Sequence, residues 1–153
     1  MPKLHLCTVC EKLLLDKEEI PSLINLFSKI VVTPPPNAGD IPKEAVVPKE
    51  WYVLAIYILE PGDFGREFFL CMQIFYPDGT PFGSLGRVQL KTPEGKERSQ
   101  ASFYVPVFPI GQRGMYRINL WLEENERRVE KSDIDIDLEL LMKSSSEKQG
   151  TAQ

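Results

Sequence analysis

The chain has 153 residues, a net charge of −4 and a calculated isoelectric point near 5.1. This is about the length of one domain, and the acidic charge argues against nucleic acid or an anionic membrane surface as a partner, since either would need a basic face. The 13 prolines and 10 glycines, set against only five alanines, favour strands and turns over a helical bundle.

Two features of the sequence bear on its compartment. The longest strongly apolar run, Trp51–Leu59, is far shorter than the roughly 20 residues that span a bilayer, and the first residues lack the apolar core of a signal peptide. Three cysteines, an odd number, fit reduced thiols better than a disulfide framework. We therefore expect a soluble cytoplasmic protein without a membrane partner.

Short apolar segments separated by turn residues predict about eight strands. In chain order they lie near residues 3–10, 24–32, 51–60, 67–76, 85–91, 101–108, 116–122 and 134–140. Residues 20–24 also fit a helical turn that begins at Pro21, although the β-branched run Ile30–Val32 favours a strand for the rest of that segment. Pro77–Thr80 and Pro93–Lys96 supply turns, because glycine accepts the positive φ of a tight reversal.

Residues 33–50 contain five of the 13 prolines. Because proline donates no backbone hydrogen bond, this segment is not expected to form a central strand. Two interpretations stay open: a stiff surface crossover between sheets, or a recognition loop.

Two of the predicted strands carry apolar side chains on both faces. In residues 51–59 and 68–75 both alternating sets of side chains are mainly apolar, whereas a two-sheet sandwich needs only one apolar face on each strand. The second face is therefore covered either by the Pro-rich or N-terminal segment of the chain itself, or by a subunit or a partner.

The last two predicted strands show the clearest alternation, with isoleucine and leucine between acids in 134–140 and apolar between polar residues in 116–122. A period of two is typical of half-buried antiparallel strands, and the short polar link 124–126 predicts a hairpin. The sequence therefore predicts an all-β fold, an antiparallel β-sandwich of about eight strands in two sheets. It spans residues 3–142 as one domain, and 143–153 form a disordered polar tail.

Candidate metal ligands occur in two places. His5, Cys7 and Cys10 lie in one predicted strand, but positions three apart face opposite sides, so the two thiols cannot bind one ion. The alternating aspartates of 133–137 begin like a calcium loop, yet Leu and Ser stand where that loop needs its glycine and its last glutamate. We therefore predict no metal and no cofactor, with the cysteines as small buried hydrophobes and the aspartates as a solvated strand face.

The sequence lacks the motifs of common catalytic sites. Its one histidine lies in the first predicted strand, there is no nucleophile elbow, and Gly83–Arg87 lacks the end of a phosphate-binding loop. The chain is therefore expected to be non-enzymatic.

The outward positions of the apolar strands suggest a binding surface. The candidate residues are Trp121, Arg117, Asn119, Tyr57, Phe69 and Phe75. Such a partly covered patch favours a protein partner or a homo-oligomer. The alternative is a carbohydrate or another small ligand at Trp121, Arg117 and Asn119, because an aromatic ring beside planar polar groups suits a sugar. Residues 123–139 hold eight acids and three bases, so a partner steered by charge would present a basic surface.

Four segments resemble a known family: Leu6–Cys10, Ile24–Ile30, Pro77–Gly79 and Gly114–Trp121. Together they are similar to an uncharacterised family of small bacterial proteins, a domain of unknown function, over about residues 4–140. The resemblance implies a β-sandwich of bacterial or phage origin. It implies no catalytic or binding residue.

Overall fold

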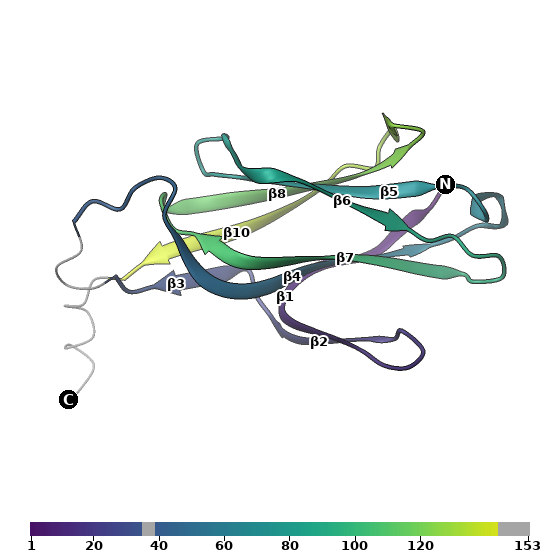
Figure 1. Ribbon diagram of the computed structural model, residues 1–153, viewed down its shortest axis with the longest axis horizontal. Helices are drawn as coiled ribbons and strands as arrows, with labels where there is room; N and C mark the ends of the chain where they lie inside the picture. The colour runs from purple at the N-terminus through teal and green to yellow at the C-terminus, as the bar shows by residue number, and fades with distance from the viewer. Residues whose placement is uncertain (35–38, 144–153) are drawn as a thin grey trace.

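Strands make up most of the chain. The computed structural model describes residues 1–34 and 39–143, and Figure 1 shows two layers of strands packed face to face. The strands are β1 (Lys3–Leu15), β2 (Pro21–Leu26), β3 (Lys29–Val32), β4 (Val46–Ile58), β5 (Phe68–Phe75), β6 (Pro81–Leu90), β7 (Arg98–Pro109), β8 (Gly114–Glu124), β9 (Arg127–Arg128) and β10 (Ile134–Met142). One 3-10 turn, η1 (Pro61–Asp63), follows β4. The predicted all-β sandwich is confirmed.

The strands form a smaller and a larger sheet. The smaller sheet has the order β2-β1-β4-β7, and the larger has the order β3-β10-β8-β5-β6, with β9 paired to β8. Within the described parts of the chain, no helix is both long and apolar enough to cross a membrane. The predicted tail over 143–153 falls almost wholly outside the described residues, which end at Lys143.

One strand pair is parallel, which corrects the purely antiparallel prediction. The predicted strand 24–32 is two strands: β2 ends at Leu26 in the smaller sheet, and β3 begins at Lys29 in the larger sheet. There β3 pairs with β10 in parallel. Ile30 anchors this crossing in the core, where it is buried. Alternation along a segment predicts a strand but not the sheet it joins, because pairing is decided by distant parts of the chain.

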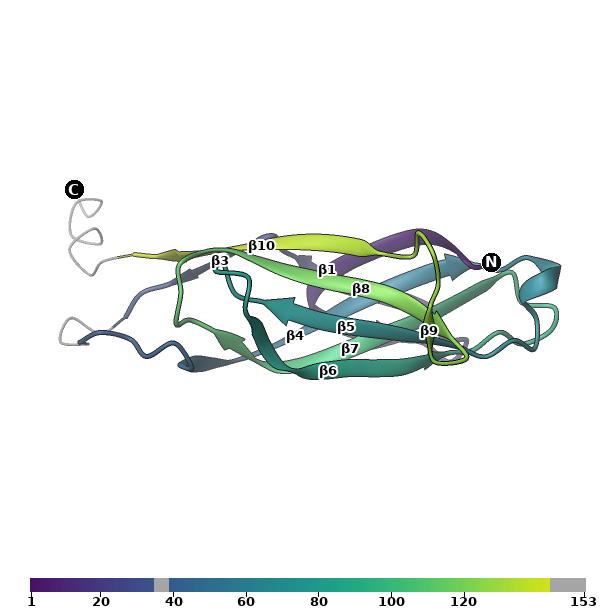
Figure 2. The same ribbon diagram turned by 90° about the horizontal axis from the view of Figure 1, so that it is seen from above.

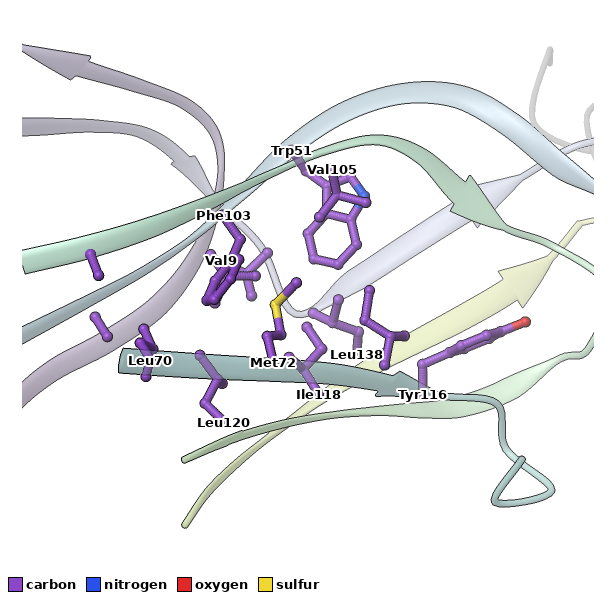
Figure 3. Close-up of a cluster of buried hydrophobic side chains, with 14 of the residues drawn as sticks. Val9, Trp51, Leu70, Met72, Phe103, Val105, Tyr116, Ile118, Leu120 and Leu138 are labelled. Carbon is purple, nitrogen blue, oxygen red and sulfur yellow. The ribbon is translucent and has the colours of Figure 1, made fainter. Parts of the chain in front are cut away.

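The core lies between the sheets and is filled by alternate side chains of both. Figure 3 shows part of it, with Val9, Trp51, Phe103 and Val105 of the smaller sheet facing Leu70, Met72, Tyr116, Ile118, Leu120 and Leu138 of the larger sheet. The Trp51 indole is fully buried, and its Nε1–H donates a hydrogen bond to the Val107 carbonyl at 2.9 Å. Truncating a buried aromatic residue of this size to Ala typically costs about 3–5 kcal/mol.

The N-terminal hairpin covers part of the second face of β4. β1 extends to Leu15, beyond its predicted end, and residues 21–26 form a strand rather than a helical turn. At the hairpin tip the Gln100 side chain of β7 donates to the Glu19 carbonyl at 2.9 Å. Leu54 on β4 and Cys10 on β1 are fully buried although neither belongs to the central core cluster. This agrees with the N-terminal cover, one of the two alternatives that the sequence left open.

The prediction that no residue of 33–50 joins a central strand was wrong for the C-terminal end of this segment. β4 begins at Val46 and contains Pro48, although β4 lies between β1 and β7. Proline is tolerated there because β1 pairs only with residues 52–58 of β4, which leaves the first half of β4 paired to β7 alone. The register also shifts between Pro48 and Trp51. Pro48 therefore occupies a local edge beside a bulge, where a missing donor is tolerated.

Residues 39–45 are held against the sandwich. The Lys43 side chain donates to Asp78 at 3.0 Å and to Thr80 at 2.8 Å. The Ile110 backbone N–H donates to the Ala45 carbonyl at 2.9 Å, and the backbone of Lys43 passes so close to Gly111 that no side chain fits there. These contacts support the crossover interpretation for this part, while residues 35–38 lie outside the described residues.

The predicted pairing of residues 116–122 with 134–140 is confirmed, since Ile136 lies opposite Ile118 in the antiparallel register of β8 and β10. The link differs from the prediction. Asn125 and Glu126 have φ values of 50° and 61° and form a tight turn, after which β9 pairs back on β8 before β10 begins. Two consecutive residues with positive φ are typical of the hairpin turn that matches strand twist.

Candidate functional site

The outer face of the larger sheet carries side chains that the core does not use. Figure 2 views this face, with β10, β8, β5 and β6 side by side. On β8, Tyr116, Ile118 and Leu120 point into the core and are almost completely buried. The intervening residues Arg117 and Asn119 therefore face outward, as the alternation predicted.

The strand register places acids and an aromatic ring beside these two residues. Arg117 lies opposite Phe75 of β5 on one side and opposite Asp137 of β10 on the other. Asn119 lies opposite Asp135 in the same way. Directly opposed residues on one face of an antiparallel pair have Cβ atoms about 5 Å apart, so these groups form one contiguous surface across three strands.

A hollow of ≈ 740 Å³ lies over these strands. We call it the outer groove. It is lined by Phe75, Met115, Arg117, Asn119, Arg128 and the aspartates Asp133, Asp135 and Asp137, together with the turn residues Tyr76, Pro77 and Gly79. Three of the six predicted binding residues thus line one groove: Phe75, Arg117 and Asn119.

The charged groups of the outer groove differ in how they are paired. Asp133 accepts a hydrogen bond from the Arg128 guanidinium at 3.2 Å, and Asp135 accepts one from the Asn119 amide at 2.9 Å. The side chains of Arg117 and Asp137 form no hydrogen bond or ion pair within residues 1–34 and 39–143. The groove therefore offers an exposed cation and an exposed anion on neighbouring strands to an incoming partner.

Trp121 faces outward but is covered, which corrects the expectation of an open aromatic surface there. Its side chain is only 8% exposed. The guanidinium carbon of Arg128 lies 4.0 Å from the centre of the indole ring. Arg128 reaches this position because the turn at Asn125–Glu126 folds β9 back beside β8. Sequence analysis missed Arg128, although the two-residue turn that places it follows β8 directly.

Phe69 and Phe75 of β5 are both half-buried on the outer face, unlike the fully buried Phe68, but they differ in their neighbours. The Arg87 guanidinium carbon lies 3.6 Å from the centre of the Phe69 ring, so this ring is covered by a cation. Phe75 instead lines the outer groove. Phe75 therefore remains a binding candidate, and Phe69 packs beneath Arg87.

Tyr57 does not lie on the outer surface, so this part of the prediction was wrong. It is 2% exposed, lies on β4 of the smaller sheet and belongs to the core cluster between the two sheets. The reason is its position in β4: residues at even spacing from the buried Trp51 share the inner face, and Tyr57 is one of them.

The cysteines are free thiols. Cys10 and Cys71 are buried, and Cys7 is partly buried and packs against the core. Burial raises the pKa of the Cys7 thiol to about 11, and burial, with help from the neighbouring Glu123 carboxylate, raises that of Cys71 to about 11. Thiols with such pKa values are protonated and unreactive at neutral pH. Across the described ranges, no group of three or more His, Cys, Asp or Glu side chains is arranged to hold a metal ion.

Comparison with known proteins adds little to this geometry. No protein-family model matches the chain, and no curated protein matches it. Among solved structures the chain is similar to an immunoglobulin-like protein from Pseudomonas aeruginosa, with 13% sequence identity and a TM-score of 0.38 over 92% of this chain and 96% of that chain. A likeness at this level carries no inference about a site or a partner.

Proposed function

We propose that the protein is a non-enzymatic β-sandwich interaction module that binds a protein partner through the outer groove. The observation that carries the proposal is the exposed pair Arg117 and Asp137 beside the half-buried ring of Phe75 and the exposed side chain of Met115. Apolar and aromatic contact area with a nearby arginine is the composition of protein interfaces.

The acids of β10 indicate the chemistry of the partner. Asp135 and Asp137 occupy alternate positions of β10, so their carboxylates lie about 7 Å apart, and Asp133 directly precedes the first residue of the strand. An extended partner segment with Lys or Arg at alternate positions has the same repeat. The excess of acids in residues 123–139 steers such a basic segment toward this edge of the outer groove.

The carbohydrate alternative fits the groove less well. Stacking on a sugar needs an open aromatic face, and the indole of Trp121 is covered by Arg128. Arg128 would have to leave both Trp121 and Asp133 before a sugar could stack. This cost favours the protein partner.

The non-enzymatic part of the proposal is supported by the lining of the outer groove, which contains no histidine, cysteine, serine or lysine. The one histidine, His5, lies on β1 of the smaller sheet. A serine, cysteine or lysine nucleophile paired with a histidine base is therefore not available in this groove.

Capture of the partner by charge variants tests the proposal. The tagged protein is used to capture binding proteins from cells that naturally produce it, and the wild type is compared with Asp137→Lys. Glu94→Lys, which makes the same charge change in the turn between β6 and β7, serves as the matched control.

We expect one specific partner that is retained by the wild type and by Glu94→Lys but lost by Asp137→Lys. A second copy of this chain is one possible partner, and sedimentation over a dilution series identifies it. Equal capture by all three proteins would contradict a role for the outer groove.

A further inference from the structure

The outer face of the larger sheet carries opposite charges on its two sides. On one side, β10 contains the acids Asp135, Asp137 and Glu139 and no basic residue. On the other side, the edge strand β6 contains Arg87 and no acid, and Lys91 follows it directly. β8 and β5 lie between these two strands, and Figure 2 shows β10 and β6 on opposite sides of the face. The face is therefore complementary in charge to itself.

The charge of Arg87 is available to a partner. Its guanidinium carbon lies 3.6 Å from the centre of the outward Phe69 ring, and stacking on a ring uses the flat side of the guanidinium while its N–H groups point out along the edge. Within residues 1–34 and 39–143, Arg87 forms no ion pair. A carboxylate from another molecule can therefore pair with it without breaking an existing salt bridge.

The strand register sets how far Arg87 lies from the nearest acid along the strands. Arg87 is opposite Cys71, and Cys71 is opposite Trp121. Asn119, two residues before Trp121, is opposite Asp135. Arg87 and Asp135 thus lie on opposite sides of the face and differ in height along the strands by one repeat of about 7 Å. A long arginine side chain spans such a difference.

A two-fold axis converts this arrangement into a pair of contacts. If a second copy is turned by 180° about an axis that runs parallel to the strands between β8 and β5, the β6 side of each copy faces the β10 side of the other. Each residue keeps its height along the strands in this rotation. Arg87 of each copy therefore meets Asp135 of the other, and the contact occurs twice, as in any isologous dimer. Asp135 keeps its negative charge for this contact, since it is bonded only to the neutral amide of Asn119.

The area of the face is sufficient for a dimer. The strands β10, β8, β5 and β6 contain eight to eleven residues each. At about 4.8 Å between strands and about 3.3 Å per residue, they cover roughly 600 Å² of flat area in each copy. Two copies then bury on the order of 1,200 Å², which is the lower limit for specific protein interfaces.

We propose that the partner of the outer face is a second copy of this chain, packed face to face about this two-fold axis with Arg87 of each copy paired to Asp135 of the other. The inference rests on the proposed function, because it names the partner that binds through the outer groove. The edge strand β6 of the second copy then supplies the basic segment that the acids of β10 attract.

Sedimentation of the purified full chain over a dilution series tests the proposal. We expect the wild type to form dimers that dissociate on dilution. Arg87→Glu places two acids opposite each other at both contacts, and Asp135→Lys places two bases opposite each other. Each variant alone should weaken the dimer about tenfold or more. Arg98→Glu makes the same charge change at the start of β7 in the smaller sheet, and it should leave the dimer unchanged.

Mixing the two charge variants separates direct pairing from a general effect on folding. In the mixed dimer one contact is Arg87 with Asp135 and the other is its reversed form, so the equimolar mixture should dimerise more strongly than either variant alone. The double variant Arg87→Glu with Asp135→Lys should dimerise for the same reason, since both of its contacts are reversed pairs.

Two results would overturn the proposal. One is a wild type that stays monomeric up to about 1 mM. The other is a mixture and a double variant that dimerise no better than the single variants. The proposed function is tested separately: a different protein that the wild type captures and Asp137→Lys does not capture would support binding through the outer groove, while a monomeric wild type would still reject the second copy as the partner.

Discussion

The guanidinium of Arg128 lies over the indole ring of Trp121, with its central carbon 4.0 Å from the ring centre, while its Nη1 is 3.2 Å from Asp133. One side chain thus covers the outward aromatic ring of β8 and forms part of the edge of the outer groove. The contact links the turn at Asn125–Glu126 to the candidate site, because that turn brings Arg128 beside β8.

Removing Arg128 should expose this tryptophan. Trp121 is 8% exposed and Trp51 is fully buried, so acrylamide should quench the fluorescence of the wild type weakly. Arg128→Ala should increase quenching and cost about 0.5–1 kcal/mol of unfolding free energy, the value of a cation–π contact at an exposed site. Arg127→Ala is the control, and the same quenching in both variants and the wild type would show that Arg128 does not cover the ring.

Gly111 should be intolerant of a side chain. A Cβ at this position would overlap the backbone of Lys43, whereas a Cβ at Gly62 would meet no atom within 4 Å. Gly111→Ala should therefore cost about 1–3 kcal/mol or more through overpacking, and Gly62→Ala should be close to neutral. Urea denaturation measures both, and equal midpoints would show that residues 39–45 are not docked as described.

Asp78 should make stability depend on pH. Hydrogen bonds from Thr80, Gln112 and Lys43 hold the pKa of Asp78 well below its usual range. A carboxylate whose pKa is lower in the folded than in the unfolded state stabilises the fold. This stabilisation is complete above the unfolded-state pKa near 4, and it is lost as the pH falls toward the folded-state pKa. The melting temperature of Asp78→Asn should therefore lie below that of the wild type at pH 7, and the difference should shrink below about pH 4. A difference that stays constant from pH 7 to pH 3 would contradict this origin.

The two buried tyrosines should respond differently to loss of the hydroxyl. The Tyr116 hydroxyl bonds to the Gln112 backbone, whereas the Tyr57 hydroxyl is unpaired within the described residues. Tyr116→Phe should cost about 0.5–1.5 kcal/mol, and Tyr57→Phe should be neutral or stabilising, since it removes a buried group that has no partner. Chemical denaturation of the two variants and the wild type measures both changes in unfolding free energy. An equal loss in the two variants would show that Tyr57 is paired in the free protein.

The sequence predicted the part of the site that depends only on local alternation. Arg117 and Asn119 face outward because their neighbours Ile118 and Leu120 face the core, and the same parity places Phe75 on the outer face of β5. Such a pattern needs no knowledge of distant parts of the chain.

The remaining features depend on which strands meet. The parallel pair of β3 with β10 joins segments more than 100 residues apart. The position of Pro48 within β4 requires that the pairing of β1 with β4 end before Pro48. The cover of Trp121 by Arg128 requires the pairing of β9 with β8. Tyr57 was misplaced for a different reason. Residues 51–59 are apolar on both faces, so alternation could not show whether the set with Trp51 and Tyr57 or the set with Leu54 faces the core.

The resonance of the Met115 methyl group tests the central claim most directly. Met115 is 55% exposed and lines the outer groove, Met72 is 7% exposed in the core, and Leu26 is 63% exposed on the edge strand β2 of the other sheet. When the captured partner is added to methyl-labelled protein, the Met115 signal should shift or broaden while those of Met72 and Leu26 stay unchanged. A change at Leu26 with an unchanged Met115 signal would place the partner on the smaller sheet and contradict binding through the outer groove.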